Sequence, residues 1–154
     1  MNLEIFDRQA VIKLCCGNEV AIQWLQLGRR YVHLIDDVID EDIPQANQAR
    51  GAERICEIGA LAIDLYTHPF FLANREALAQ AMMTNTNSYA DSVAWEKSGT
   101  KWKRDFSDWA RHGWVEVALV VASICGGYRH MRAMSQELRT VCYMDHHKPD
   151  TTPI

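Results

Sequence analysis

The strongest constraint on the fold is the sparse placement of residues that stop helices. The four prolines are Pro44, Pro69, Pro149 and Pro153, so the long stretches between them are free to be helical. Proline interrupts a helix because it lacks a backbone N–H and its ring clashes with the preceding turn. No stretch shows the sustained apolar–polar alternation with β-branched residues that is typical of a strand. The sequence therefore predicts an all-α protein.

Helical periodicity and end signals divide the chain into five or six expected helices. Their approximate ranges are 8–16, 19–39, 47–66, 70–97 (or from 74), 102–125 and 128–143. Gly17, Gly99 and Gly127 lie at expected ends, where glycine is favoured because it tolerates positive φ. We expect a single-domain helical bundle over residues 1–144, followed by a flexible tail over residues 145–154.

The apolar stripes of these helices predict which faces form the core. The stripes are Val20, Trp24, Leu27, Tyr31, Leu34 and Val38 on the second helix, and Ile55, Ile58, Ala62 and Leu65 on the third. Met82 and Met83 are expected in the core as well. Four tryptophans surround the turn between the fourth and fifth expected helices: Trp95, Trp102, Trp109 and Trp114. Their spacing predicts packing at that turn rather than stacking against a ligand.

Composition narrows the class of protein further. A chain of 154 residues with 48% hydrophobic and 23% charged residues is typical of one globular domain. Its net charge of −4 argues against nucleic acid as a partner, because no basic excess is available to displace counterions. The longest apolar stretch, residues 113–127, contains Glu116 and is shorter than the ~20 residues of a membrane span. We therefore expect no membrane-spanning segment.

The cysteines and the N-terminal residues indicate the cellular compartment. The five cysteines are odd in number and show no C-x-x-C spacing, so reduced thiols are expected. The segment MNLEIFDRQ has neither the basic nor the apolar region of a secretory signal. Both observations predict a cytoplasmic protein.

Acidic residues gather at the end of the second expected helix, in the sequence YVHLIDDVIDED. Asp36, Asp37 and Asp40 form the pattern D-D-x-x-D, and His33 falls on the same third of the helix circumference. Carboxylates this close repel one another unless a cation lies among them, and Mg²⁺ prefers such oxygen ligands. The alternative is a solvated acidic face that Arg29 and Arg30 neutralise in part.

The fourth expected helix carries polar residues on its apolar side. Asn85, Ser92 and Glu96 share the face of Leu78, Met82, Tyr89 and Val93, whereas Asn87 and Asp91 belong to a second polar stripe. Asn, Ser and Thr are weak helix formers, and a buried polar group without a partner costs about 1–3 kcal/mol. These residues therefore either line a water-filled cavity or face solvent.

The fifth expected helix contains Arg111 and His112, followed by the apolar run WVEVALVVASIC. Such a run predicts a helix that is buried on all sides. Glu116 lies inside this run and would need a partner, and His112, one turn earlier, is the nearest. The two residues predict either a satisfied core pair or a catalytic pair.

Two of these motifs resemble those of a known family. DDVID at 36–40 is similar to the first aspartate-rich motif of the class I isoprenoid (terpenoid) synthases, all-helical proteins in which the carboxylates bind Mg²⁺ that holds a substrate diphosphate. Residues 88–96, SYADSVAWE, resemble the second metal motif of terpene cyclases, Asn/Asp-Asp-x-x-Ser/Thr-x-x-x-Glu. Ser92 and Glu96 match that motif, whereas Ser88 stands at its first position.

The resemblance implies a terpenoid-synthase-like bundle that binds Mg²⁺ and an isoprenoid diphosphate. The implied metal ligands are Asp36, Asp37 and Asp40 on one helix and Asn87, Asp91, Ser92 and Glu96 on another. Lys101, Arg104 and Arg111 would then hold the free oxygens of the diphosphate. The chain has about half the usual length of such synthases, so a degenerate relative that keeps only the fold fits as well.

Three classes of function follow from these patterns. The first is a Mg²⁺-dependent lyase or transferase acting on an isoprenoid diphosphate. The second is a non-enzymatic helical protein that forms a homodimer or binds a partner through apolar helices. The third is an all-α nucleotide pyrophosphohydrolase, for which Glu53, Glu57 and Asp64 provide a further acidic stripe.

Overall fold

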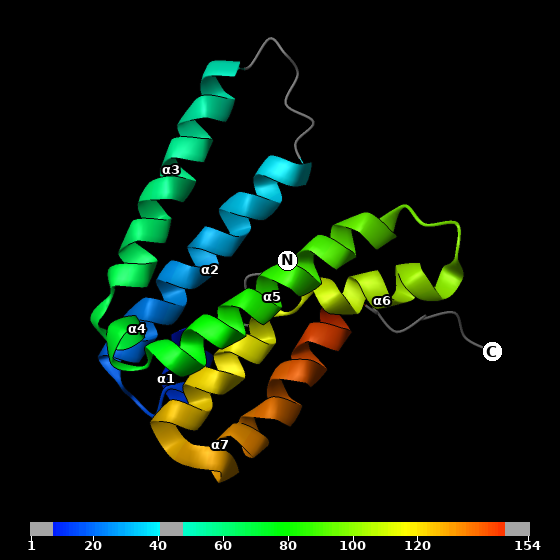
Figure 1. Ribbon diagram of the computed structural model, residues 1–154. Coiled ribbons are helices and arrows are strands. Elements are labelled where there is room, and N and C mark those ends of the chain that lie inside the picture. Colours follow the sequence, from blue (N-terminus) through cyan, green and yellow to red (C-terminus); the bar gives the residue numbers. More distant parts are fainter. Residues whose placement is uncertain (1–7, 41–47, 147–154) are drawn as a thin grey trace, which may run out of the picture. The chain divides into compact units, whose positions relative to one another are not determined.

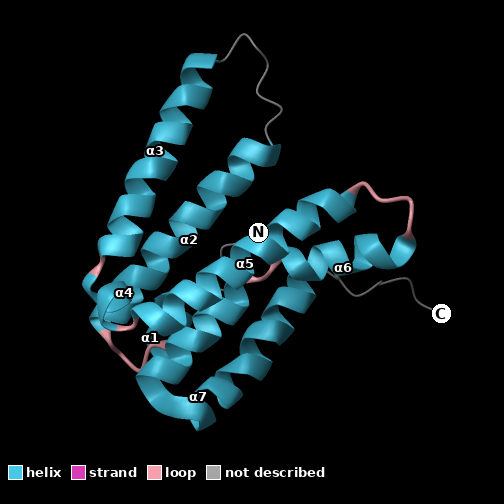
Figure 2. Cartoon of the chain, in the orientation of Figure 1, coloured by secondary structure: helices cyan, strands magenta, loops and turns pink. Residues whose placement is uncertain are grey.

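The computed structural model describes residues 8–40 and 48–146, and its regular structure is helical (Figures 1 and 2). The helices are α1 (Arg8–Leu14), α2 (Glu19–Asp40), α3 (Gln48–Thr67), α4 (Pro69–Ala73), α5 (Arg75–Glu96), α6 (Lys101–Arg111) and α7 (Trp114–His146). The described residues contain no strand. The prediction of an all-α protein is therefore confirmed.

The helices group into two compact units, and each is described by itself. Unit 2 is the continuous segment Glu19–Arg75, with α2, α3 and α4. Unit 1 contains α1 together with α5, α6 and α7, and thus combines chain from both sides of unit 2. The single domain over residues 1–144 stays a prediction.

In unit 2, the helices α2, α3 and α4 pack against one another around Trp24. Trp24 is fully buried, and its indole Nε1 donates to the carbonyl oxygen of Leu65 at 3.0 Å. This bond satisfies the one polar atom of a large apolar side chain, which burial otherwise penalises. The core positions predicted at Trp24 and Leu65 are confirmed.

The short helix α4 completes this core with Phe70 and Phe71, which are both buried. Its start is set by His68, whose Nδ1 accepts a hydrogen bond from the backbone N–H of Phe70 at 3.3 Å. Pro69 follows at the first turn, where its missing N–H removes no helical bond. Asn74 closes the helix by donating its side-chain amide to the carbonyl oxygen of Phe70.

In unit 1, α1 packs against α7 through residues far apart in the sequence. The ring Nε2 of His130 contacts the carbonyl oxygen of Leu14 at 2.9 Å, at the C-terminal end of α1. The chain then leaves α1 through Cys16 and Gly17, both with positive φ. Gly17 tolerates this left-handed conformation, as its place at an expected helix end predicted.

The sequence prediction placed no helix end at Gly113 and placed one at Gly127. The segment expected as one helix over residues 102–125 is divided between α6 and α7 at His112 and Gly113. A Cβ at Gly113 would lie 2.6 Å from Oδ1 of Asn85, so a larger residue there would require the Asn85 side chain to move. The expected boundary at Gly127 is present as a non-helical residue with φ 75° within α7.

Several expected core residues lie at the surface instead. Val20, Ile55 and Met83 have exposed fractions of 43%, 62% and 62%. Periodicity shows which residues share a face, but not how wide the contact with the next helix is.

The remaining predictions concern the membrane and the tail. No helix within residues 8–40 and 48–146 is long and apolar enough to cross a bilayer. The backbone of α7 is helical through His146, so residues 145 and 146 belong to a helix. The rest of the expected tail, residues 147–154, lies outside the described part of the chain, as does the predicted helix start at Asn47.

Candidate functional site

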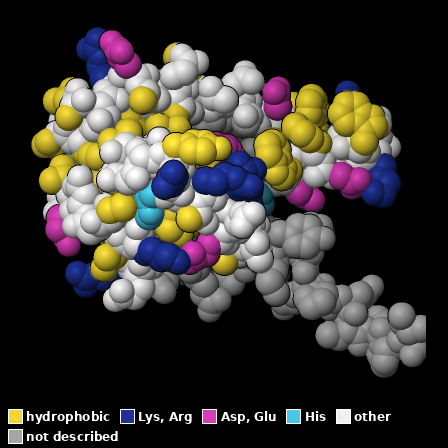
Figure 3. Space-filling model, turned by 90° about the horizontal axis from the view of Figure 1, so that it is seen from below, with side chains coloured by type: hydrophobic (Ala, Val, Ile, Leu, Met, Phe, Trp, Pro, Cys, Tyr) yellow, Lys and Arg dark blue, Asp and Glu magenta, His cyan; other side chains and the backbone are white. Residues whose placement is uncertain are grey.

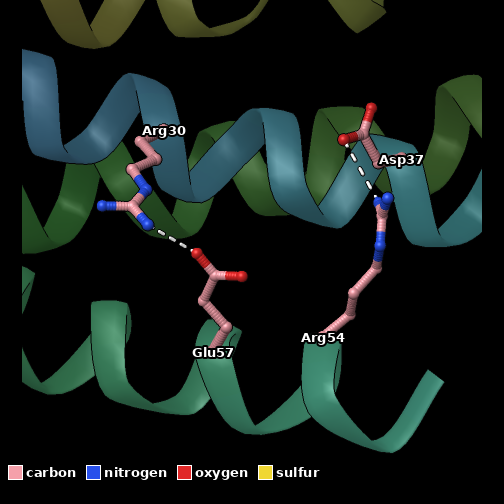
Figure 4. A network of polar contacts seen from close by, with 4 residues as sticks. All are labelled: Arg30, Asp37, Arg54 and Glu57. Atoms are coloured by element: carbon pink, nitrogen blue, oxygen red, sulfur yellow. Dashed lines mark hydrogen bonds and ion pairs between the residues drawn. The ribbon is translucent and has the colours of Figure 1, made fainter. Parts of the chain in front are cut away.

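The aspartate-rich motif forms the last turns of α2, as its helical spacing predicted. Asp37 and Asp40 are exposed and Asp36 is half-buried. Figure 4 shows that Asp37 pairs with Arg54 of α3, with 3.3 Å between the guanidinium and the carboxylate. Arg30 pairs with Glu57 of α3 at 2.6 Å rather than with the acids of its own helix. Arginines of α2 and α3 therefore neutralise acids of the facing helix within unit 2.

His33 lies one turn before this motif. Burial lowers the pKa of His33, and the nearby Arg29 guanidinium lowers it further. Its Nε2 is buried and has no hydrogen-bond partner among the described residues. The imidazole is therefore neutral at pH 7, the form in which histidine can bind a metal.

The residues predicted as the second metal motif on α5 take part in separate local contacts. The Asn87 amide donates to the Asp91 carboxylate at 3.4 Å. The Ser92 hydroxyl is fully buried and donates to the carbonyl oxygen of Tyr89 at 2.7 Å. Glu96 pairs with Arg111 of α6 at 3.0 Å. The inward direction of Ser92 is thus explained by a hydrogen bond to the backbone.

The contact between α5 and α6 contains a second buried hydroxyl. Ser107 of α6 donates to the carbonyl oxygen of Ser92 at 2.7 Å, and both side chains are buried. Ala110 is buried on the same side of α6. These small residues form the side of α6 that is buried within unit 1.

The three basic residues predicted to hold a diphosphate each have a partner within the protein. Lys101 pairs with Asp105 at 2.6 Å, one turn along α6. Arg104 donates to the carbonyl oxygen of Ser98 at 2.6 Å, and Arg111 pairs with Glu96. Exposed pairs of this kind contribute only about 0–1 kcal/mol, so they restrain the side chains weakly.

The surroundings of Glu116 differ from the sequence prediction. Glu116 is exposed and pairs with Arg139 from the second half of α7. His112 lies in the turn before α7, and its Nδ1 is 2.6 Å from the carbonyl oxygen of Asp108. The prediction of a helix buried on all sides was therefore wrong, because α7 presents Glu116 to solvent.

Within the described part of the chain, no group of three or more His, Cys, Asp or Glu side chains is arranged to hold a metal ion. Asp36, Asp37 and Asp40 belong to unit 2, whereas Asn87, Asp91, Ser92 and Glu96 belong to unit 1. The Mg²⁺ site built from both sets of residues therefore stays a prediction.

Four aromatic rings gather where α5 and α6 meet, and the sequence analysis predicted neither their exposure nor the part played by Phe106. We call Trp95, Trp102, Phe106 and Trp109 the aromatic surface. The ring centroids of Trp95 lie 5.9 Å from Trp102 and 5.7 Å from Phe106, and Phe106 lies 5.4 Å from Trp109. The predicted packing of these rings is present, yet Trp102, Phe106 and Trp109 remain 59%, 45% and 57% exposed.

The signal for this surface is present in the sequence KWKRDFSDWAR. Trp102, Phe106 and Trp109 are spaced at i, i+4 and i+7, which places them on one side of α6. On the face drawn in Figure 3, hydrophobic side chains gather at the right-hand end, where α6 lies in Figure 1. An apolar stripe predicts a side of the helix, but not whether protein or solvent covers it.

The described thiols are all free. Cys15 is buried, Cys125 is half-buried, and Cys16 and Cys56 are exposed. Burial raises the pKa of Cys15 to about 12, with a further contribution from nearby Cys125. The side chain of Cys142 lies outside the described part of the chain.

Comparisons with protein-family models, with curated proteins and with solved structures found no match.

Proposed function

We propose that this chain is a non-enzymatic helical interaction protein. The observation that carries the proposal is the aromatic surface, in which three large rings remain about half exposed on one side of α6. Burying a large apolar side chain contributes about 1.5–3 kcal/mol, and tryptophan is enriched among residues that dominate binding. A complex in which a partner covers these rings would be stabilised by this free energy, because the chain alone does not bury them.

The ionic contacts of the predicted metal ligands support the same proposal. Asp37 and Glu96 each pair with an arginine, and the Ser92 hydroxyl is turned toward a backbone carbonyl. Separate pairing of this kind is typical of a solvated acidic surface rather than of convergent metal ligands. The free thiols of the described cysteines support our further proposal of a cytoplasmic location.

A second candidate is Mg²⁺-dependent chemistry on a diphosphate, either isoprenoid transfer or cyclisation or nucleotide pyrophosphohydrolysis. It is favoured by the position of D-D-x-x-D in the last turns of a long helix, with Asp37 and Asp40 exposed. In this proposal Mg²⁺ would neutralise the diphosphate, and Lys101 and Arg104 would hold its free oxygens.

Calorimetric titration with Mg²⁺ and Mn²⁺, with and without pyrophosphate, separates the two proposals. The interaction proposal expects no metal binding in the millimolar range, and no effect of D36N/D40N. Binding that pyrophosphate strengthens and that D36N/D40N abolishes would instead support the enzymatic proposal. E19Q/E76Q is the control, because it removes two exposed carboxylates, from the first turns of α2 and α5, that belong to none of the predicted sites.

A further inference from the structure

The aromatic surface lies on a helix whose adjacent side is buried. Ser107 and Ala110 are buried against unit 1, about 100° around the helix from the stripe of Trp102, Phe106 and Trp109. At 1.5 Å per residue, the stripe from Trp102 to Trp109 is roughly 10 Å long. The rings therefore lie next to the buried side of α6 and remain exposed themselves.

Basic residues outnumber acidic ones beside these rings, although the chain as a whole is acidic. Residues 96–111 include five basic residues and three acidic ones, Glu96, Asp105 and Asp108, in a chain of net charge −4. Lys103 lies over two rings of the surface, with Nζ 5.8 Å from the centroid of Trp95 and 5.7 Å from that of Trp102. This places a positive charge directly at the exposed apolar rings.

Three of these cations are available to an anionic partner. Lys101 is paired with Asp105. Among the described residues, Lys97, Lys103 and Arg104 form no ion pair with a carboxylate, and Arg104 bonds only to a backbone carbonyl. A surface of exposed Trp and Phe rings with uncompensated Lys and Arg matches the boundary between lipid headgroups and acyl chains.

We propose that the aromatic surface, together with Lys97, Lys103 and Arg104, docks the protein on the surface of an anionic lipid bilayer. This inference rests on the proposed interaction function and names its partner. The rings would enter the boundary between headgroups and acyl chains, and the cations would contact lipid phosphates and carboxylates. The 11 residues of α6 extend for about 16 Å, so the helix would lie in the plane of the bilayer surface.

The positive charge beside the aromatic surface argues against a second copy of this chain as its binding partner. A two-fold dimer would place the same patch on both sides of the interface. This would bring Lys97, Lys103 and Arg104 of one copy near the same cluster of the other, and repulsion between like charges opposes such a contact. An anionic bilayer has both an apolar region that can bury the rings and negative charges that can pair with the cations.

The test is binding of the full chain to vesicles, measured by co-sedimentation and by the blue shift of tryptophan fluorescence. The vesicles are phosphatidylcholine with 30% phosphatidylserine, or phosphatidylcholine alone. We expect binding to the anionic vesicles at 0.1 M salt, weak binding to the neutral ones, and a large loss at 1 M salt, where the Debye length falls from about 10 Å to about 3 Å.

Two variants test the rings and the charges separately. W102A/W109A is expected to weaken vesicle binding roughly 25-fold, because each half-exposed indole contributes about fivefold. K97Q/K103Q keeps every ring and is expected to weaken binding by a similar factor, because each cation near the surface contributes about fivefold. Y128A removes an aromatic ring of unit 1 that is 68% exposed, and R129Q/R132Q removes two exposed charges; both should bind within twofold of wild type.

Absence of wild-type binding to anionic vesicles at 0.1 M salt would overturn the lipid inference, as would equal binding by all four variants. Analytical ultracentrifugation of the same proteins shows which proposal has failed. Self-association that W102A/W109A abolishes, without vesicle binding, refutes the lipid inference and leaves the interaction function standing. Metal binding that pyrophosphate strengthens refutes the interaction function itself.

Discussion

The molecule contains two clusters of four aromatic residues that differ in almost every physical respect. In unit 2, Trp24, Tyr66, Phe70 and Phe71 meet where α2, α3 and α4 pack together. In unit 1, the aromatic surface lies on α5 and α6 and remains largely exposed. The first cluster has a buried indole bonded to Leu65, and the second has a lysine over its rings.

The difference shows how neighbouring residues determine the role of an aromatic side chain. Trp24 is surrounded in sequence by Ala21, Leu25 and Gly28, which are buried on the same helix. Trp102 stands between Lys101 and Lys103, whose charges require water or an anionic partner. The same residue type thus packs in the core of one unit and remains exposed at the surface of the other.

The largest expected difference in stability is between alanine variants of Trp24 and of Trp109. Trp24→Ala should lower the free energy of unfolding of unit 2 by about 3–5 kcal/mol, because it leaves a large cavity and removes the partner of the Leu65 carbonyl. Trp109→Ala removes a ring that is already 57% exposed and should cost less than about 1 kcal/mol. Urea denaturation monitored by circular dichroism measures both, and equal losses would remove the distinction between the clusters.

A smaller effect is expected at the base of the aromatic surface. Ser107→Ala removes the buried hydrogen bond from α6 to the Ser92 carbonyl and should cost about 0.5–1.5 kcal/mol. The matched control is Thr84→Ala, which removes an exposed hydroxyl-to-carbonyl bond within α5. Thermal denaturation of both variants checks the prediction, and a larger loss for Thr84→Ala would contradict the seating of α6 by Ser107.

The buried cluster should also be sensitive to acid. Burial lowers the pKa of His68, which caps α4 beside Phe70, and it also lowers the pKa of His33. The unfolded histidines take up protons near pH 6.5, before the folded ones do, so folding stability is lost as the pH falls below this value. We expect melting temperatures to decline between pH 7 and pH 5.

Variants at the two histidines test whether these residues cause the decline in melting temperature. His68→Asn retains a capping acceptor that does not titrate, and His33→Gln removes the other titrating ring. Each should reduce the slope of melting temperature against pH, whereas Trp102→Ala in the aromatic surface should leave the slope unchanged. An unaltered slope in both histidine variants would show that other groups cause the acid sensitivity.

The smallest effect is expected at the acidic end of α2. Asp37→Asn breaks the pair with Arg54, in which the carboxylate is 57% exposed, and should cost no more than about 1 kcal/mol. Denaturation at 0.1 M and 1 M salt checks this, because screening should reduce the difference further. A loss above 2 kcal/mol would mean that the motif is a structural centre rather than a solvated surface.

The sequence predicted those features that depend on local chemistry. The all-α class, the helix end at Gly17 and the buried positions of Trp24 and Leu65 follow from glycine conformation and apolar periodicity. Features that depend on distant residues were missed. The break at Gly113 reflects its close approach to Asn85, which is remote in sequence.

The candidate site was predictable only in part, for the same reason. The helical position of Asp36, Asp37 and Asp40 followed from their spacing, but the pairing of Asp37 with Arg54 required the packing of α3 on α2. The spacing of Trp102, Phe106 and Trp109 was visible, yet periodicity could not show that this side of α6 faces solvent. Burial of the adjacent side depends on Ser107 and its distant partner.

The placement of α1 has a consequence for synthesis on the ribosome. Unit 2 is complete once Arg75 has been translated, whereas α1 belongs to a unit whose other helices follow later. The contact between Leu14 and His130 spans 116 residues, so at 5–20 residues per second α1 waits roughly 6–25 s for its partner. During this interval Val11 and Leu14, buried in the finished protein, are open to chaperones. Nascent unit 2 can therefore fold while the N-terminal helix is still unpaired.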